Sequence, residues 1–177
     1  MPIDLSALVK QAREKFGQDV YGYTEFRKQY TLRIRREANL RILKWLKEEP
    51  GYKFEMLVDV TCVDSLRLPE DMLAEYPERF AVVYNLNSLE HNERMRVKAF
   101  VPEDNCEIDT VSGMWHGANW GEREAFDMFG VVFRGHPDLK RILMPENYEG
   151  HPLRKDYPLK GRGERDNFPK YEEIPEA

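Results

Sequence analysis

The chain has 177 residues, of which 41% are hydrophobic and 33% are charged, and its formal net charge is −5. This length fits one domain with an appendage, and the longest mainly apolar run, residues 54–63, is broken by charged side chains, so none of the chain is expected to span a bilayer. The N-terminus lacks the basic, apolar and small-residue order of a signal peptide, so we expect a cytoplasmic protein whose membrane association depends on partners.

The first third of the chain predicts a helix, two strands and a second helix. Asp4 is a plausible N-cap for a helix whose apolar stripe is formed by Leu5, Leu8, Val9, Ala12 and Phe16. Short strands are expected at residues 20–26 and 30–35. A second helix at residues 37–49 follows from apolar residues at helical spacing, and Pro50 stops it.

Positive charge is concentrated at the start of the chain. Residues 1–53 carry 12 basic and 7 acidic side chains, whereas the rest of the chain is acidic. Arg33, Arg35 and Arg36 are the best candidates for a nucleic-acid patch. Arg33 and Arg35 alternate with apolar residues, however, which favours a strand with arginines on its solvent face. No nucleic-acid-binding motif accompanies them, so we expect no nucleic-acid partner.

The middle of the chain predicts a sheet. Strict alternation of Phe54, Met56, Val58, Val60 and Cys62 indicates one long strand. After a loop at residues 65–78, residues 80–86 and 95–99 alternate again, and the polar turn between them predicts an antiparallel hairpin. The fold class expected is α+β, a two-layer sandwich of a mainly antiparallel sheet with helices, in a domain spanning residues 1–143.

A charged helix is expected from Trp120 to Phe129. Asn119 and Glu122 have the spacing of a capping box at its start, and Gly130 is well placed to end it in the left-handed conformation.

The acidic and basic residues of this helix leave two interpretations open. Glu122 and Glu124 would face the positive end of the helix dipole, and Arg123 could pair with Asp127 across one turn. One interpretation is a solvated helix end. The other is an ion-pair network across a subunit interface.

Residues for chemistry within the chain itself are few. Cys62 and Cys106 are the only cysteines, too few for an iron–sulfur cluster, and Cys62 is expected to be a reduced core residue. The four histidines are isolated, so no metal site is expected. His136, between a glycine and a proline, is expected to be a turn histidine that bonds nearby backbone, although a hydrolase using His136 with Asp138 is an alternative.

The end of the chain has a different composition. Six of the eleven prolines lie between Pro137 and Ala177, and only 9 of the 34 residues from Met144 onward are hydrophobic. Such a segment cannot bury a core of its own. We therefore predict an extended, proline-rich, partner-binding arm at residues 144–177, with a mobile tail or an arm folded back on its own domain as alternatives. Its candidate anchors are Leu153, Tyr157, Leu159, Phe168, Tyr171 and Ile174.

Five spaced motifs carry a family resemblance. They are Glu122-Arg-Glu124, Asp127-Met-Phe-Gly130, Gly135-His-Pro137, Arg141-Ile-Leu143 and Pro152-Leu-Arg-Lys-Asp-Tyr157. Together they resemble the signature of the C subunit of respiratory NADH:quinone oxidoreductase, the small hydrophilic subunit of bacterial complex I next to its quinone-reducing subunit.

The resemblance implies a structural, cofactor-free subunit in the peripheral arm of a proton-translocating complex. That complex would pass electrons from NADH to quinone, and FMN and iron–sulfur clusters would belong to partner subunits. The partners implied are the large quinone-reducing subunit and the cluster-bearing subunits, on the cytoplasmic side of the cell inner membrane. The equivalent subunit of a membrane hydrogenase or photosynthetic NDH complex, or a free-standing adaptor, remains an alternative.

No catalytic, cofactor or metal residue is expected in this chain, and the predicted site is a subunit interface. Its expected ion-pairing residues are Glu122, Arg123, Glu124, Asp127, Arg141, Arg154 and Asp156. Its expected packing anchors are Trp120, Phe129, Tyr157 and Leu159, and the signature histidine His136 completes it.

Overall fold

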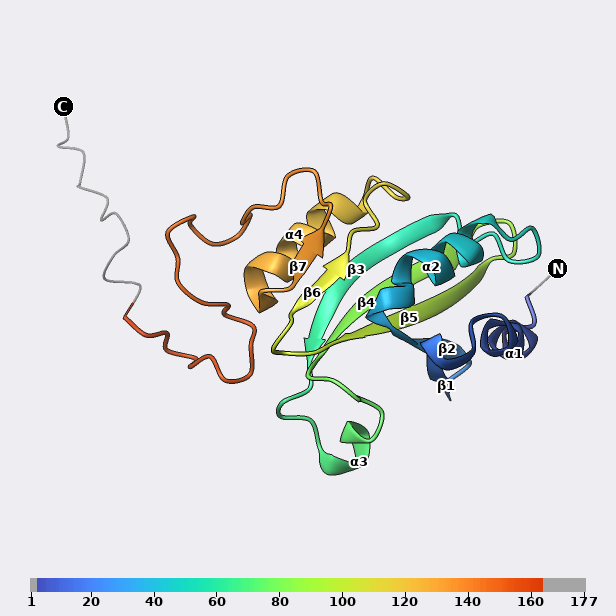
Figure 1. Cartoon of the computed structure of the whole chain (residues 1–177), viewed down its shortest axis with the longest axis horizontal. Coiled ribbons are helices and arrows are strands. Elements are labelled where there is room, and N and C mark those ends of the chain that lie inside the picture. The colour runs from blue at the N-terminus through green and yellow to red at the C-terminus, as the bar shows by residue number, and fades with distance from the viewer. Residues whose placement is uncertain (1–2, 164–177) are drawn as a thin grey trace.

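A computed structural model describes residues 3–163 of the chain (Figure 1). Its α-helices are α1 (Leu5–Phe16), α2 (Asn39–Glu48), α3 (Glu70–Leu73) and α4 (Ala118–Phe129). Its strands are β1 (Val20–Phe26), β2 (Gln29–Arg35), β3 (Met56–Asp64), β4 (Phe80–Ser88), β5 (Glu93–Val101), β6 (Glu107–Asp109) and β7 (Val132–Arg134). Short 3₁₀ turns at Gly17–Asp19 and Arg36–Ala38 follow α1 and β2.

The central sheet has five strands in the order β1-β2-β5-β4-β3. Three of its four pairings are antiparallel, and β2 and β5 are parallel. Parallel strands need a long connection between them. The chain between β2 and β5 supplies it by passing through α2, β3 and β4, so that β5 enters the sheet at the same end as β2. The expected α+β class with a mainly antiparallel sheet is confirmed, including the β4–β5 hairpin.

One hydrophobic core joins the helices to the sheet. Side chains of α1, α2 and α4 belong to the same buried cluster as one face of β2, β3, β4 and β5. Leu8, Leu46 and Tyr84 are completely buried in it. Figure 1 shows α2 across the middle strands and α4 beside β3, at the edge of the sheet. The apolar faces of the helices thus pack against the apolar face of the sheet and form one layer of side chains.

The start of α1 is capped as predicted. The Oδ1 atom of Asp4 accepts from the N–H groups of Ser6 and Ala7 at 3.0 and 3.1 Å. Cys62 is also as expected, a free thiol that is 5% exposed. Burial raises the pKa of this thiol far above its ordinary value, so it remains protonated and unreactive.

The alternation from Phe54 to Cys62 does not describe one flat strand. A bulge lies between Leu57 and Asp59, and β3 begins only at Met56. The extra residue changes which face the side chains point to, so Met56 and Val58 are 43% and 54% exposed. The predicted strand is therefore present, but it starts two residues later than the alternation indicates and is interrupted by the bulge.

Two small elements were absent from the sequence prediction. The loop at residues 65–78 contains the single turn α3, and β6 and β7 form a separate parallel pair. Elements this short carry too little periodicity to be recognised from sequence. In the described range 3–163, no helix combines the length and apolar content needed to cross a bilayer.

Candidate partner-binding site

Helix α4 carries the first part of the predicted interface, and it starts differently from the prediction. It begins at Ala118, the N-cap residue is Gly117, and no side chain caps it. The predicted capping box of Asn119 and Glu122 is therefore wrong. The predicted end is confirmed: Gly130 has a φ of 78° and its N–H bonds the carbonyl of Phe126.

Glu122 points into the protein instead of into solvent. Its carboxylate is fully buried and accepts from the N–H of Val111 at 2.7 Å and from the hydroxyl of Thr110. The Nε2 atom of His136 lies 3.9 Å away. Burial raises the pKa of Glu122 to about 7, against the effect of the two hydrogen bonds. This residue joins α4 to the segment before it, so the interpretation as a solvated helix end is wrong for Glu122, although Glu124 is exposed.

Asp127 is the main anchor of the segment that follows β7. Its fully buried Oδ2 atom accepts from the consecutive N–H groups of Ile142, Leu143 and Met144 at 3.0, 2.7 and 2.9 Å. Its Oδ1 atom pairs with Arg141 at 2.7 Å. Burial alone would raise the pKa of Asp127, but these donors lower it, so the carboxylate is charged. Asp127 thus fixes the backbone where the predicted arm begins.

Arg123 does not pair with Asp127, because Arg141 occupies that carboxylate. Arg123 instead donates to the carbonyl of Lys140 at 3.1 Å, and its guanidinium lies over the ring of Trp120, 4.8 Å from the centroid. Trp120 is 64% exposed although it belongs to a helix in contact with the core. Arg123, which is 8% exposed, therefore holds the Trp120 ring out toward solvent.

A groove runs beside Trp120, between α4 and the bulged part of β3. Its volume is about 340 Å³, and Gly121 lies at its base close to the backbone of Val60. Its walls include Leu57, Val58, Trp120, Glu124 and Ile142. An exposed tryptophan beside a groove lined by both apolar and polar groups has the composition of a protein-binding site.

The first half of the predicted arm lies on its own domain. Three backbone carbonyls in the last turn of α4 form hydrogen bonds with the arm. The carbonyl of Asp127 lies 3.0 Å from the ring of His151, and that of Met128 accepts from the N–H of Leu153 at 3.1 Å. The carbonyl of Phe129 accepts from the guanidinium of Arg154 at 2.6 Å. These carbonyls lack partners within the helix, so the arm acts as its C-terminal cap. This corresponds to the folded-back alternative for this part of the arm.

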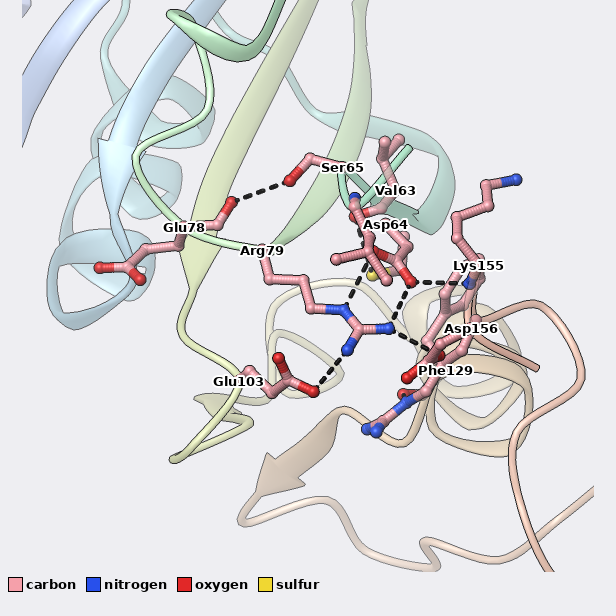
Figure 2. A network of polar contacts seen from close by, with 12 residues as sticks. Val63, Asp64, Ser65, Glu78, Arg79, Glu103, Phe129, Lys155 and Asp156 are labelled. Atoms are coloured by element: carbon pink, nitrogen blue, oxygen red, sulfur yellow. Dashed lines mark hydrogen bonds and ion pairs between the residues drawn. The ribbon is translucent and has the colours of Figure 1, made fainter. Parts of the chain in front are cut away.

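A second anchor holds the arm at the end of β3 (Figure 2). The Arg79 guanidinium pairs with Asp64 at 2.9 Å, with Asp156 at 2.7 Å and with Glu103. Asp64, whose side chain is fully buried, also accepts from the N–H of Lys155 at 2.8 Å. Figure 2 shows the arm passing beside this cluster, with the side chain of Asp156 and the backbone N–H of Lys155 directed at it and the Lys155 side chain extending away.

The contacts of Asp64 in this cluster favour its charged carboxylate form. Burial alone would raise the pKa of Asp64, but Arg79 and the N–H groups of Lys155 and Leu66 lower it. Sequence reasoning missed Asp64 and Arg79. The available signal was weak: an acid at the end of an apolar alternation and an arginine just before the next one.

Most of the predicted ion-pairing residues therefore have partners within the chain. Arg141, Arg154 and Asp156 join the arm to α4 and β3, and Glu122 and Asp127 are buried. Only Glu124 lies on a described surface without such a contact in this network. Whether any of these residues also touches a neighbouring subunit remains a prediction.

The predicted packing anchors differ in their exposure to solvent. Phe129 is 8% exposed and belongs to the core, so little of its ring is accessible to a partner. Tyr157 bonds Tyr148 through their hydroxyls at 2.6 Å. Leu159 is fully exposed, at 102% relative accessibility. The anchors predicted at Phe168, Tyr171 and Ile174 lie outside the described residues.

His136 is a turn histidine, as expected. Its Nδ1 atom accepts from the N–H of Asp138 at 3.1 Å, and its Nε2 atom lies 3.2 Å from the carbonyl of Asn119. The carboxylate of Asp138 pairs instead with Lys140 at 3.0 Å. The alternative of a hydrolase built on His136 and Asp138 therefore lacks its side-chain pair. Over residues 3–163, no three metal-binding side chains are grouped as a metal site.

Comparisons with known proteins agree with the motif resemblance. The family described as "Respiratory-chain NADH dehydrogenase, 30 Kd subunit" matches residues 32–163. The NADH-quinone oxidoreductase C subunit of Geobacter metallireducens is 50% identical over 88% of this chain and 90% of its own length. The corresponding protein of Bordetella pertussis is 41% identical over 89% of this chain and 79% of its own length.

Two solved structures are similar. One is the trypsin-resistant fragment (1–134) of Nqo5, which is 34% identical, with a TM-score of 0.65 over 76% of this chain and 98% of its own. The other belongs to a membrane-bound sulfane sulfur reductase, an archaeal respiratory membrane complex. Its TM-score is 0.68 over 97% of this chain and 95% of its own, but at 22% identity it supports the fold alone.

Proposed function

The chain belongs to the respiratory-chain NADH dehydrogenase 30 kDa subunit family, and from this premise we propose that it is a structural, cofactor-free subunit of a proton-translocating NADH:quinone oxidoreductase. In this role it holds the quinone-reducing subunit and the cluster-bearing subunits in register while they carry electrons from NADH to quinone. FMN and iron–sulfur clusters belong to those partners. The chain is part of an enzyme without supplying catalytic residues, and it lies on the cytoplasmic side of the inner membrane, attached through the complex.

The observation that carries this proposal is the set of contacts that the signature residues make within the chain. Asp127 and Arg141 fix the backbone after β7, and Arg154 and Asp156 fix it again beside α4 and β3. A charged cluster that serves to position backbone is suited to a scaffold. The charged groups of Asp127, Arg154 and Asp156 are engaged with other side chains or with backbone atoms of the same chain.

The fixed elements present two features to a partner. One is the Trp120 groove, whose ring is held in place by Arg123. The other is the part of the arm that leaves the Arg79 cluster, where Leu159 is fully exposed. Pre-organised aromatic and apolar anchors bind with a smaller loss of conformational entropy, so they contribute affinity efficiently.

Substitution of Trp120 by alanine tests the proposal. Because the ring is 64% exposed, Trp120→Ala is expected to leave the melting temperature of the chain nearly unchanged. The fraction of the chain that co-purifies with the complex from host membranes should fall about tenfold, as for a central interface tryptophan. Leu89→Ala, at a position 61% exposed in the β4–β5 turn, is the matched control and should assemble normally. Equal assembly of both variants would contradict the docking role of the groove.

A further inference from the structure

The central sheet has a second face that the core helices do not use. Strand residues that alternate with the core positions point away from the buried cluster, and one end of this face is covered by the loop that contains α3. There Tyr76 packs edge-on against Phe100, with ring centroids 5.6 Å apart. The rest of the face, toward the start of β5, includes a hollow of about 430 Å³.

This face is rich in positive charge. Arg33 lies directly opposite Lys98 in the parallel β2–β5 pair, and Arg96 and Arg94 follow on the same side of β5. Arg13 reaches the same region from α1, because its guanidinium and that of Arg33 both converge on Gly22. Like charges on neighbouring strands repel one another, so this arrangement costs stability in the isolated chain.

The chain does not neutralise these cations. Arg33 donates to the carbonyl of Glu75 at 3.3 Å, Arg96 to the amide oxygen of Asn85 at 3.2 Å, and Lys98 to the hydroxyl of Tyr76 at 2.6 Å. All three acceptors are neutral. Within residues 3–163, none of the five basic side chains forms an ion pair with a carboxylate.

The opposing negative charge is small. Among the outward positions of β2 to β5, the only carboxylate is that of Asp59, opposite Asn85. The protein as a whole has a formal net charge of −5. The positive charge of this face therefore does not reflect the overall charge of the protein. Such a face is complementary to a negatively charged surface on a partner.

We infer that this basic sheet face binds an acidic segment of a neighbouring subunit. A second copy of the chain would present the same cations and be repelled. The hollow is lined by the exposed apolar residues Met56 and Val58 and by two arginines, Arg94 and Arg96, against the single carboxylate of Asp59. Its occupant therefore combines carboxylates with an apolar side chain. That combination fits a protein segment better than a nucleic acid or a phospholipid headgroup. The inference rests on the proposed membership of a complex, but not on the Trp120 groove.

Charge reversal tests the inference in the assembled complex. The double variant Arg94→Glu/Arg96→Glu should lower the fraction of the chain retained on the complex about tenfold at moderate ionic strength. The loss should be accompanied by an unchanged melting temperature. Lys10→Glu/Lys44→Glu, which makes the same change in net charge on α1 and α2, is the control and should assemble normally. Full retention of the Arg94→Glu/Arg96→Glu variant would overturn the inference.

Photo-crosslinking then identifies the occupant. A photoreactive phenylalanine analogue replaces Met56, inside the hollow, and in a second variant replaces Trp120. The inference expects the probe at position 56 to capture a partner-subunit peptide rich in Asp and Glu. Capture of lipid or nucleic acid, or no product at position 56 while position 120 is crosslinked, would refute it. No protein product at either position would contradict the proposed function itself and remove the basis of the inference.

Discussion

At the scale of single residues, helix α4 carries two buried acids whose pKa values are shifted in opposite directions. Asp127 receives three backbone N–H groups and a guanidinium, which favour its charged form. Glu122 receives one N–H and one hydroxyl, which do not offset its burial. Burial raises the pKa of both carboxyl groups, and only at Asp127 do the donors, which are more numerous and include a charged guanidinium, outweigh it.

Glu122 should make stability depend on pH near neutrality. Its pKa in the folded protein is about 7, above its ordinary value of 4.5, so the folded state holds the proton more tightly than the unfolded state. The resulting stabilisation is complete below pH 4.5 and is lost as the pH rises through 7. Relative to Glu122→Gln, the wild-type free energy of unfolding should fall by about 2 kcal/mol between pH 5 and 8. Urea denaturation at a series of pH values measures this difference, and a constant difference would refute the assignment.

Asp127 should dominate the local stability of the segment after β7. Asp127→Asn keeps the size of the side chain but removes the charge that Arg141 and the backbone donors surround. We expect the free energy of unfolding to fall by about 2–4 kcal/mol. Asp138→Asn, which alters an exposed pair with Lys140, is the control and should leave the free energy of unfolding nearly unchanged. Similar losses in the two variants would show that the Asp127 contacts contribute little.

At the scale of elements, the sequence predicts α4 and its end but not its function in the fold. The apolar stripe and Gly130 depend on residues within a few positions, so they could be read from the pattern. The partners of Glu122 and Asp127 lie 11 to 17 positions away, at Val111 and Met144 among others. Local capping rules cannot anticipate such contacts, because they describe only an isolated helix.

Gly130 joins the end of α4 to the arm. It adopts a φ of 78°, and a Cβ atom there would lie 2.5 Å from the ring of His151 and 2.8 Å from the guanidinium of Arg154. Gly130→Ala should therefore cost about 2 kcal/mol through backbone strain and displacement of the arm. Limited proteolysis should then cut near residues 145–155 faster than in the wild type. Gly113→Ala, where a Cβ meets no neighbour within 4 Å, should behave as the wild type; equal digestion of both variants would argue against this contact.

At the scale of the whole molecule, composition distinguishes the last part of the chain from the rest but does not show how the arm is attached. Proline content and the scarcity of apolar residues correctly indicate that residues 144–163 form no core, helix or strand of their own. The attachment of the arm depends on Asp64 and Arg79, which are 92 and 77 positions before Asp156. No sequence pattern links residues so far apart, so only the structure reveals the folded-back segment.

A truncated chain measures what this attachment contributes. A chain that ends after Leu143 loses the bonds from Lys155 to Asp64, from Asp156 to Arg79 and from Arg154 to Phe129. It should remain folded, but its free energy of unfolding should be lower by about 3 kcal/mol than that of a chain ending after residue 163. Urea denaturation of the two chains gives the difference, and coincident transitions would mean that the arm contacts do not stabilise the domain.

The central claim is that this protein serves as a cofactor-free structural subunit of an NADH:quinone oxidoreductase. The most direct measurement is to tag the chain at its N-terminus in its native host, purify it from gently solubilised membranes, identify the accompanying subunits and assay NADH:quinone reduction. The account predicts recovery with cluster-bearing and quinone-reducing subunits, NADH:quinone reductase activity in that fraction, and no flavin or iron in the chain once it is separated. Recovery of the chain alone from the soluble fraction would contradict the account.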